Sequence, residues 1–182
     1  MPTLLRKMNF STTLLLAPIA YSVHHFEEHI LFNFREWRLL YFPDSNALST
    51  ELVYMILIAI TLIYVFLHNV FESGPSAMSA VLFLMATQVQ NALFHLGATV
   101  YFWDFSPGLY TALLLYLPVN FLIAQKALRE GWVTGKSLAL LFLVGGISFW
   151  LFEVFGPFII GITVFITVIW ILVDGVRKPS TG

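Results

Sequence analysis

This 182-residue chain contains six long apolar runs, which are separated by polar or Pro/Gly clusters. These runs restrict the folds that the chain can adopt. Each run is close to the roughly 20 residues that a helix needs to cross a lipid bilayer. Only 10% of the residues are charged, whereas about 25% are charged in a typical soluble domain, and the mean hydropathy is +0.85. We therefore expect an all-α, polytopic membrane bundle of six transmembrane helices, with residues 1–182 as a single domain. The expected helices cover residues 11–34, 52–71, 76–103, 108–125, 137–155 and 158–173.

The basic residues are unevenly divided between the two ends of such a bundle. Seven of the nine would lie on the side of both termini, and only Arg35 and Arg38 on the other. Because basic residues favour the cytoplasmic side, we expect cytoplasmic N- and C-termini in a multi-pass protein of the plasma (inner) membrane. Nine Lys and Arg against ten Asp and Glu leave no basic excess, which argues against a nucleic-acid partner. The seven are Arg6, Lys7, Lys126, Arg129, Lys136, Arg177 and Lys178.

Within the first expected helix, five ionisable side chains occur in the six positions from His24 to His29. Placing one charge in hydrocarbon costs roughly 2.5–3.5 kcal/mol on insertion scales. Such a cluster therefore needs mutual pairing, a bound ion or a water-filled pocket. On a regular helix His24, Glu27 and Glu28 share one face, so that they can ligate a metal or pair a base with an acid. The alternative is a His–Glu hydrogen-bond network that only specifies helix packing.

The same stretch contains a second pattern, His25-Phe26-Glu27-Glu28-His29. Its H-x-x-E-H spelling is that of the inverzincin zinc helix, a soluble protease motif. In this frame His25 and His29, one turn apart, would bind the metal, and Glu28 would be the base. Alternatively, His25 and His29 face a neighbouring helix or the outer water.

Polar residues also occur in the third and fifth expected helices. Asn91 and His95 lie one turn apart, with Gln88 one turn earlier on the same face. His95 can complete a metal site, and Asn91 can bind or orient a carboxylate or a substrate; the alternative is interhelical hydrogen bonding. Glu153 is the only ionisable residue of the fifth helix and can contribute a carboxylate to the same site. Alternatively, its side chain extends to the membrane interface.

These polar groups share a common depth in the six-helix topology. The first, third and fifth helices run in the same direction, and each reaches its polar residues about 13–19 residues, or roughly 20–28 Å, after entry. We therefore predict one shared cavity in the outer half of the bundle. His68 and Glu72, near the inner end of the second helix, are expected to be a surface pair outside it. The predicted site residues are His24, Glu27, Glu28, Asn91, His95 and Glu153, with Gln88, His25 and His29 as substrate-binding or supporting neighbours.

The combination of His24-x-x-Glu27-Glu28, Asn91-x-x-x-His95 and a later Glu153 resembles the HXXEE-domain family of small integral membrane proteins. The resemblance extends over most of the chain, because the three elements lie on the first, third and fifth expected helices. It implies a metal-dependent membrane enzyme without naming a substrate. It also favours the H-x-x-E-E frame over the H-x-x-E-H frame.

These patterns favour a divalent-metal-dependent enzyme, most simply a hydrolase that acts on a lipid or other hydrophobic substrate. The metal would be held by His24, His95 and one or two of Glu27, Glu28 and Glu153, and a remaining carboxylate would activate water. The chain has no cysteine, so the ligands must be nitrogen or oxygen; zinc is the first expectation, and iron or a two-metal site is the alternative. Alternative functions are a metal-free acid/base isomerase of a lipid or terpenoid, and a small transporter or proton-coupled binding protein. Hydrophobic small molecules and membrane lipids are the expected partners.

Overall fold

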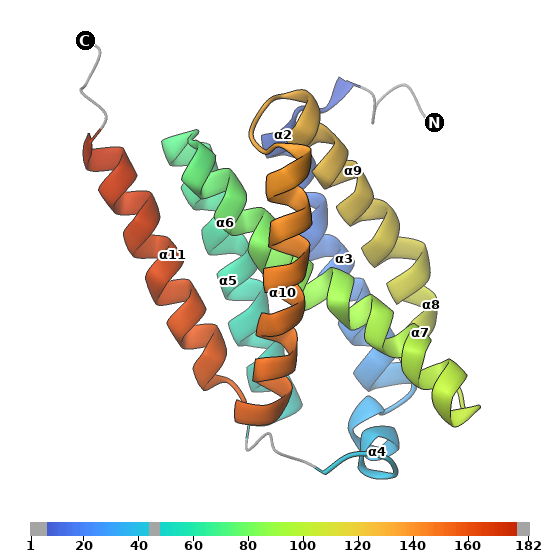
Figure 1. Cartoon of the computed structure of the whole chain (residues 1–182). Helices are drawn as coiled ribbons and strands as arrows, with labels where there is room; N and C mark the ends of the chain where they lie inside the picture. The colour runs from blue at the N-terminus through green and yellow to red at the C-terminus, as the bar shows by residue number, and fades with distance from the viewer. Residues whose placement is uncertain (1–6, 44–47, 178–182) are drawn as a thin grey trace.

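The computed structural model describes residues 7–43 and 48–177, and every element within these ranges is helical (Figure 1). Most elements are α-helices, and three are π-helical segments, named η, that continue an α-helix. The elements are α2 (Phe10–Leu14), α3 (Leu16–His25), η1 (Phe26–Leu31), α4 (Phe34–Leu39), α5 (Thr50–Phe71), α6 (Gly74–Leu84), η2 (Met85–Val89), α7 (Gln90–Phe102), α8 (Leu109–Thr111), η3 (Ala112–Tyr116), α9 (Leu117–Arg129), α10 (Gly135–Phe155) and α11 (Phe158–Arg177).

Five helical stretches of the described chain are long and apolar enough to cross a membrane. Three of them are the single helices α5, α10 and α11, and the other two are the composite helices α6–η2–α7 and α8–η3–α9. They agree with the second to sixth expected helices, so the expectation of an all-α membrane protein is confirmed. The stretches are Thr50–Phe71, Gly74–Phe102, Leu109–Arg129, Gly135–Phe155 and Phe158–Arg177.

The prediction of six transmembrane helices was wrong in its first member. Residues 11–34 form shorter pieces, with a break between α2 and α3. Pro18 has no N–H to donate to the carbonyl of Leu14, four residues earlier, which accounts for a break at this point. The ten residues of α3 and the six of η1 are fewer than the roughly 20 that a membrane helix needs, and η1 contains the charged residues Glu27 and Glu28.

The α2–α3–η1 segment nevertheless lies within the bundle. Figure 1 shows it in blue, running from the end that contains the α9–α10 connection to the opposite end, where α4 lies. It contacts α5, α9 and η3, and Phe10, Leu14 and Ala17 are fully buried. The surrounding helices thus bury His24, Glu27 and Glu28, whereas apolar side chains of the same segment, such as Ile19 and Phe26, are exposed.

Helix α10 approaches η2 closely at Gly145. A Cβ added to this glycine would lie 2.8 Å from the Cβ of Met85. Small residues allow membrane helices to come this close, and α6 contributes the buried Ala77 and Ala80 to the same core. The close contact fixes the position of the π-helical segment of the third predicted helix.

Helix α4 closes the end of the bundle next to η1. The indole N–H of Trp37 and the hydroxyl of Tyr41 both donate to Oδ2 of Asp104, at 2.7 and 2.8 Å. The Arg38 guanidinium donates to the Glu153 carboxylate at 2.7 Å. These bonds attach the α4 region to the α7–α8 connection on one side and to α10 on the other.

Candidate metal centre

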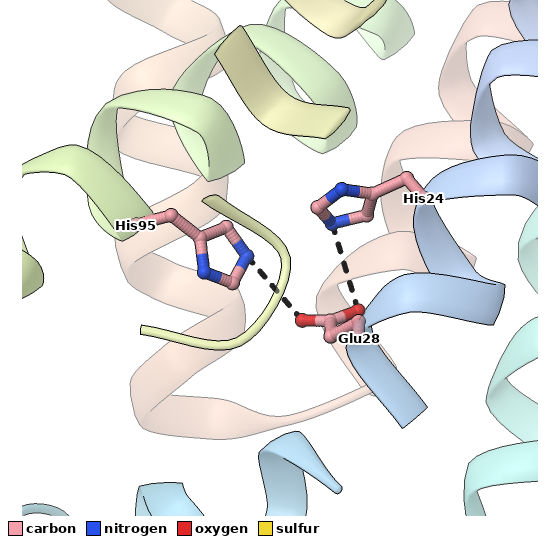
Figure 2. A group of neighbouring side chains, drawn as sticks. All are labelled: His24, Glu28 and His95. Atoms are coloured by element: carbon pink, nitrogen blue, oxygen red, sulfur yellow. Dashed lines mark ion pairs between the residues drawn. The ribbon is translucent and has the colours of Figure 1, made fainter. Parts of the chain in front are cut away.

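Three side chains from distant parts of the sequence converge in the interior (Figure 2). His24 lies on α3, Glu28 on η1 and His95 on α7, and they are 1%, 8% and 0% exposed. The Nε2 atom of His24 lies 3.6 Å from Oε2 of Glu28, and the Nε2 atom of His95 lies 3.4 Å from Oε1. Their donor atoms all lie within 4.8 Å of one another, so the three residues can hold a metal ion.

Each histidine of this set is oriented by a hydroxyl group. The Nδ1 atom of His24 hydrogen-bonds with Oγ1 of Thr111, and that of His95 with Oγ of Ser106, both at 2.9 Å. Both Nε2 atoms therefore face Glu28; they are buried and have no hydrogen-bond partner among the described residues. Metal-binding histidines commonly have this arrangement, in which the second ring nitrogen contacts a polar group.

The turn between α7 and α8 passes directly beside the two rings. Gly108 has a φ of +96°, and a Cβ added there would lie 2.8 Å from Cε1 of His24 and 3.0 Å from Cε1 of His95. Only glycine suits both this backbone conformation and this space. The sequence alone did not indicate Ser106, Gly108 or Thr111 as site residues: a turn glycine predicts a backbone conformation, but not a contact with a distant histidine.

Glu27 is turned away from the set. Its carboxylate accepts the backbone N–H groups of Tyr110 and Thr111, at 3.1 and 2.7 Å, in the first turn of α8. A negative charge is favourable at this position because the first N–H groups of a helix have no partner within it. Glu27 therefore holds α8 in place and is not one of the potential metal ligands of this set.

Three helices of the described chain contain a π-helical segment with buried polar side chains. These side chains are Glu27 and Glu28 in η1, Gln88 in η2 and Tyr116 in η3. Such segments are rare and are frequent at functional sites. Because the wider π-turn changes the direction of the side chains that follow, Glu28 meets His24 whereas Glu27 does not.

A cavity of about 180 Å³ lies beside the set and brings in other predicted residues. Asn91 lines it, with a buried Oδ1 atom that has no hydrogen-bond partner in the described part of the chain. Glu153 also lines it, but its carboxylate is paired with Arg38. The sequence did not indicate Tyr116 as a site residue. Its hydroxyl is buried and, like Oδ1 of Asn91, has no hydrogen-bond partner among the described residues, and its ring centroid is 4.2 Å from that of His24.

Gln88 has a packing role. Its side-chain nitrogen donates to the carbonyl of Ala17 at 3.0 Å, and its side-chain oxygen accepts from Nδ2 of Asn120 at 2.8 Å. These bonds connect η2 with α3 and α9. This is the interhelical hydrogen bonding that was the alternative for the polar residues of the third helix.

The other two histidines of the same stretch, His25 and His29, lie on another side of Glu28. The Nε2 atom of His29 is 3.2 Å from Oε2 of Glu28. The ring of His25 stacks on Tyr54 at 4.5 Å and lies 4.6 Å from that of His29. His25, Glu28 and His29 form a second group of donor atoms within 4.8 Å of one another. Glu28 is thus common to the H-x-x-E-E and H-x-x-E-H frames.

His68 and Glu72 lie outside the cavity, but the expectation of a surface pair was wrong. His68 is fully buried, its Nδ1 atom hydrogen-bonds with Ser76 at 3.0 Å, and its ring makes edge contacts with Phe10 and Trp132. Glu72 is exposed just after α5. The reason is tertiary: α2 and the α9–α10 connection cover this side of α5, which no local sequence pattern indicates.

Comparison with known proteins places this chain in a wider group. A family model described as "Protein of unknown function with HXXEE motif" matches residues 15–123, more than half of the chain. This range contains His24, Glu28 and His95 and ends before Glu153. "Uncharacterized protein YrkK" of Bacillus subtilis (strain 168) is 31% identical over 102 residues, which cover 54% of this chain and 65% of that protein. No solved structure matches the chain.

Proposed function

This chain belongs to the HXXEE family, and we propose that its His–Glu site binds a divalent metal ion for catalysis in the membrane. The substrate would be a lipid or another hydrophobic molecule, and the reaction most simply a hydrolysis. The main support is the buried set of His24, Glu28 and His95, in which both histidine Nε2 atoms have no hydrogen-bond partner among the described residues. Buried polar atoms normally have partners, so two such nitrogens that face a carboxylate indicate a ligand.

The distances within the set suit a shared ion better than direct ion pairs. Charge-assisted hydrogen bonds between nitrogen and a carboxylate are about 2.7–2.9 Å long, whereas the two nitrogen-to-oxygen distances here are 3.4 and 3.6 Å. Ligands at about 2.0–2.2 Å from a tetrahedral zinc ion lie roughly 3.3–3.6 Å from one another. Two imidazoles and a carboxylate are a ligand set that both zinc and iron accept.

Three protein ligands leave a coordination position open, as catalytic zinc sites do. When bound, such an ion polarises a carbonyl or phosphoryl oxygen and lowers the pKa of water to about 7. The chain itself keeps both Nε2 atoms directed at Glu28 through the hydroxyls of Thr111 and Ser106. It also buries all three ligands, which keeps bulk water away from them.

The cavity beside the set supplies the remaining groups. Glu153 is a carboxylate of this cavity that lies outside both groups of metal ligands, so we assign it the transfer of a proton to or from the substrate. Arg38 holds it in place by the 2.7 Å ion pair. The Asn91 oxygen and the Tyr116 hydroxyl, both buried and unpaired within the described structure, can hydrogen-bond to the substrate.

An apolar groove that adjoins the cavity supports a hydrophobic substrate. The groove lies between α5 and α11, its lining has no polar side chain among the described residues, and its volume is about 610 Å³. Small-molecule sites are typically roughly 300–1,000 Å³. A hydrocarbon chain in this groove would place its polar end at the His–Glu site, because the groove and the cavity share part of their lining. The shared residues are Leu48, Val53, Leu57, Phe152 and Ile160.

The charge distribution supports an orientation for the bundle. The α9–α10 connection and the C-terminal end of α11 lie together at the end opposite α4 (Figure 1). Since basic residues favour the cytoplasmic side, this end and both termini would be cytoplasmic, and the metal centre would lie in the outer half of the plasma membrane. The basic residues are Lys7, Lys126, Arg129, Lys136 and Arg177 at this end, and Arg35 and Arg38 at α4. Arg6 and Lys178, which were expected on the same side, lie outside the described residues.

Elemental analysis of the detergent-purified chain tests the metal proposal. We expect a tightly bound divalent ion in the wild-type protein and its loss in His24→Ala and Glu28→Gln. His68→Ala is a matched control, because it removes an equally buried histidine that also contacts a hydroxyl. Glu27→Gln is the second control; it should keep the ion but lower the free energy of unfolding by about 1.5–3 kcal/mol, because α8 loses a charge-assisted hydrogen bond. Loss of the ion in both controls would contradict the assignment.

A metal-free acid/base enzyme, such as a lipid or terpenoid isomerase, is the second candidate. It is supported by the 3.2 Å distance between Nε2 of His29 and Oε2 of Glu28, since a hydrogen-bonded pair of this kind can pass a proton to or from a substrate. A purified protein that contains no metal and is not stabilised by added Zn²⁺ would favour this candidate. Its binding of a lipid should then be lost in Glu28→Gln.

A further inference from the structure

Glu28 is shared between two groups of potential metal ligands. One group is the buried set described above, and the other consists of His25, Glu28 and His29; within each, the donor atoms lie within 4.8 Å of one another. We infer that the chain binds two divalent cations, one in each group, and that the Glu28 carboxylate bridges them. This inference rests on the proposed metal function and extends it to a second ion with its own histidine ligands.

The two carboxylate oxygens of Glu28 are placed for bridging. Oε1 is 3.4 Å from Nε2 of His95 in the first group. Oε2 lies between the two groups, 3.2 Å from Nε2 of His29 and 3.6 Å from Nε2 of His24. A carboxylate can bind a different cation through each oxygen, and the two ions of a two-metal site are about 3.5–4 Å apart. Helical bundles that hold two ions in their core also build the site from glutamates and histidines on facing helices.

His25 and His29 are arranged as a chelating pair. They are four residues apart at the junction of α3 and η1, and their ring centroids are 4.6 Å apart. Two histidines one turn apart on a helix are a common zinc-binding element. Tyr54 stacks on His25 at 4.5 Å, and Phe34 contacts the ring of His29 edge-on at 6.0 Å, so that aromatic neighbours hold both rings in position.

The surroundings of the second group favour a cation. The carboxylate of Glu51, at the start of α5, interacts electrostatically with both His25 and His29. The side chain of His29 is 17% exposed, whereas those of His24 and His95 are 2% and 0% exposed. The second ion can therefore exchange with water more readily, and we expect it to bind more weakly than the first.

The number of Zn²⁺ ions bound by the full chain tests this inference. Protein stripped with a chelator is titrated with Zn²⁺ alone, and the bound ions are counted after free ion is removed. We expect two ions per chain in the wild type and in the control His68→Ala, and one in each of His25→Ala and His29→Ala. Glu28→Gln should weaken the binding of both ions by about tenfold or more, since it alters a ligand common to both.

A second readout reports the bridge itself. Two Mn²⁺ ions joined by a carboxylate are magnetically coupled, so the Mn²⁺-loaded wild type should give the electron paramagnetic resonance spectrum of a coupled pair. His29→Ala should give that of an isolated ion. A variant that merely disturbs packing would not convert one spectrum into the other, and His25→Ala provides an independent test where His29→Ala does not fold.

The outcomes separate this inference from the proposed function. One Zn²⁺ per chain in the wild type, lost in His24→Ala and kept in His25→Ala and His29→Ala, would overturn the two-ion site and leave the proposed function intact. A single ion lost equally in His24→Ala and His29→Ala would mean that both bind the same ion, which also overturns it. No bound ion in any of the proteins would overturn both proposals.

Discussion

Gly108 lies where the α7–α8 turn touches both histidine rings of the candidate metal centre. Gly108→Ala should weaken metal binding by about 10–100-fold, the usual effect of disturbing the groups that support metal ligands. The reason is that the added Cβ would lie 2.8 Å from Cε1 of His24 and must displace that ring. The positive φ of +96° also adds backbone strain of about 1–2 kcal/mol. Zn²⁺ titration and thermal unfolding measure the two effects.

Gly131→Ala is the matched control for this prediction. Its φ is +77°, but apart from the glycine itself and its two chain neighbours no atom of the described structure lies within 4 Å of the added Cβ. It should therefore lower the melting temperature without changing the affinity for metal. Wild-type affinity in Gly108→Ala would show that the turn adjusts and that its contact with the histidine rings is unimportant.

The histidines and the carboxylate of the set stand out in the sequence, whereas the hydroxyls that orient them do not. Ionisable residues within apolar segments are costly wherever the chain folds, so His24, Glu28 and His95 attract attention from composition alone. Thr111 and Ser106 are small polar residues at a turn, where such residues are common for conformational reasons. Nothing in their position indicates that the Thr111 hydroxyl meets a histidine 87 residues away.

At the scale of elements, the π-helical segment η1 determines which carboxylate, that of Glu27 or that of Glu28, lies next to the histidines. A regular helix places both Glu27 and Glu28 on the face of His24, but η1 begins at Phe26 and leaves only Glu28 in contact with the set. Apolar periodicity does not distinguish an α-turn from a π-turn over so few residues. The segment is held by tertiary contacts, including the bonds from Glu27 to α8, which the sequence does not reveal.

The attachment of α4 should depend on pH through Asp104. Hydrogen bonds from the Tyr41 hydroxyl and the Trp37 indole hold the pKa of the Asp104 carboxyl below its ordinary value. Since the unfolded value is about 3.9, this stabilisation is fully present above about pH 4 and is lost as the pH falls through the lower, folded-state pKa. Asp104→Asn should remove the pH dependence, and amide hydrogen exchange of α4 measures it.

At neutral pH the α4 amides of Asp104→Asn should exchange faster than those of the wild type. Glu36→Gln is the control, because this carboxylate also lies on α4 but contacts Asn33 instead of Asp104. Equal exchange in Asp104→Asn and the wild type would show that other contacts hold α4.

At the scale of the whole molecule, single cysteines can report orientation, because the chain has none of its own. Trp103, after α7, is 94% exposed, and Lys136, at the start of α10, is also exposed. We expect Trp103→Cys to react with a membrane-impermeant maleimide on intact cells, and Lys136→Cys only after permeabilisation, because the proposed orientation places the basic end in the cytoplasm. The reverse pattern would invert the orientation, and labelling of both from outside would contradict a membrane crossing by α8–η3–α9.

Five apolar helices of the bundle were predictable because hydropathy depends on local composition. The structure of the first expected helix was not predictable in this way. Its ionisable residues and Pro18 are accommodated by contacts with neighbouring helices, which form only in the folded bundle. The sequence predicted a single site because the polar residues of the first, third and fifth helices were expected at the same depth in the membrane. In the structure Asn91 and Glu153 do line one cavity with His24 and Glu28, although Glu153 pairs with Arg38.

The groove between α5 and α11 has a consequence for the kinetics of the proposed enzyme. Exposed side chains of α11, among them Phe165, Ile169 and Leu172, form part of its lining, so a substrate would enter sideways from the leaflet. Encounters would then occur by two-dimensional diffusion, and the quantity that sets the rate would be the mole fraction of substrate among the surrounding lipids. Adding inert phospholipid would slow turnover, whereas enlarging the aqueous volume would leave it unchanged.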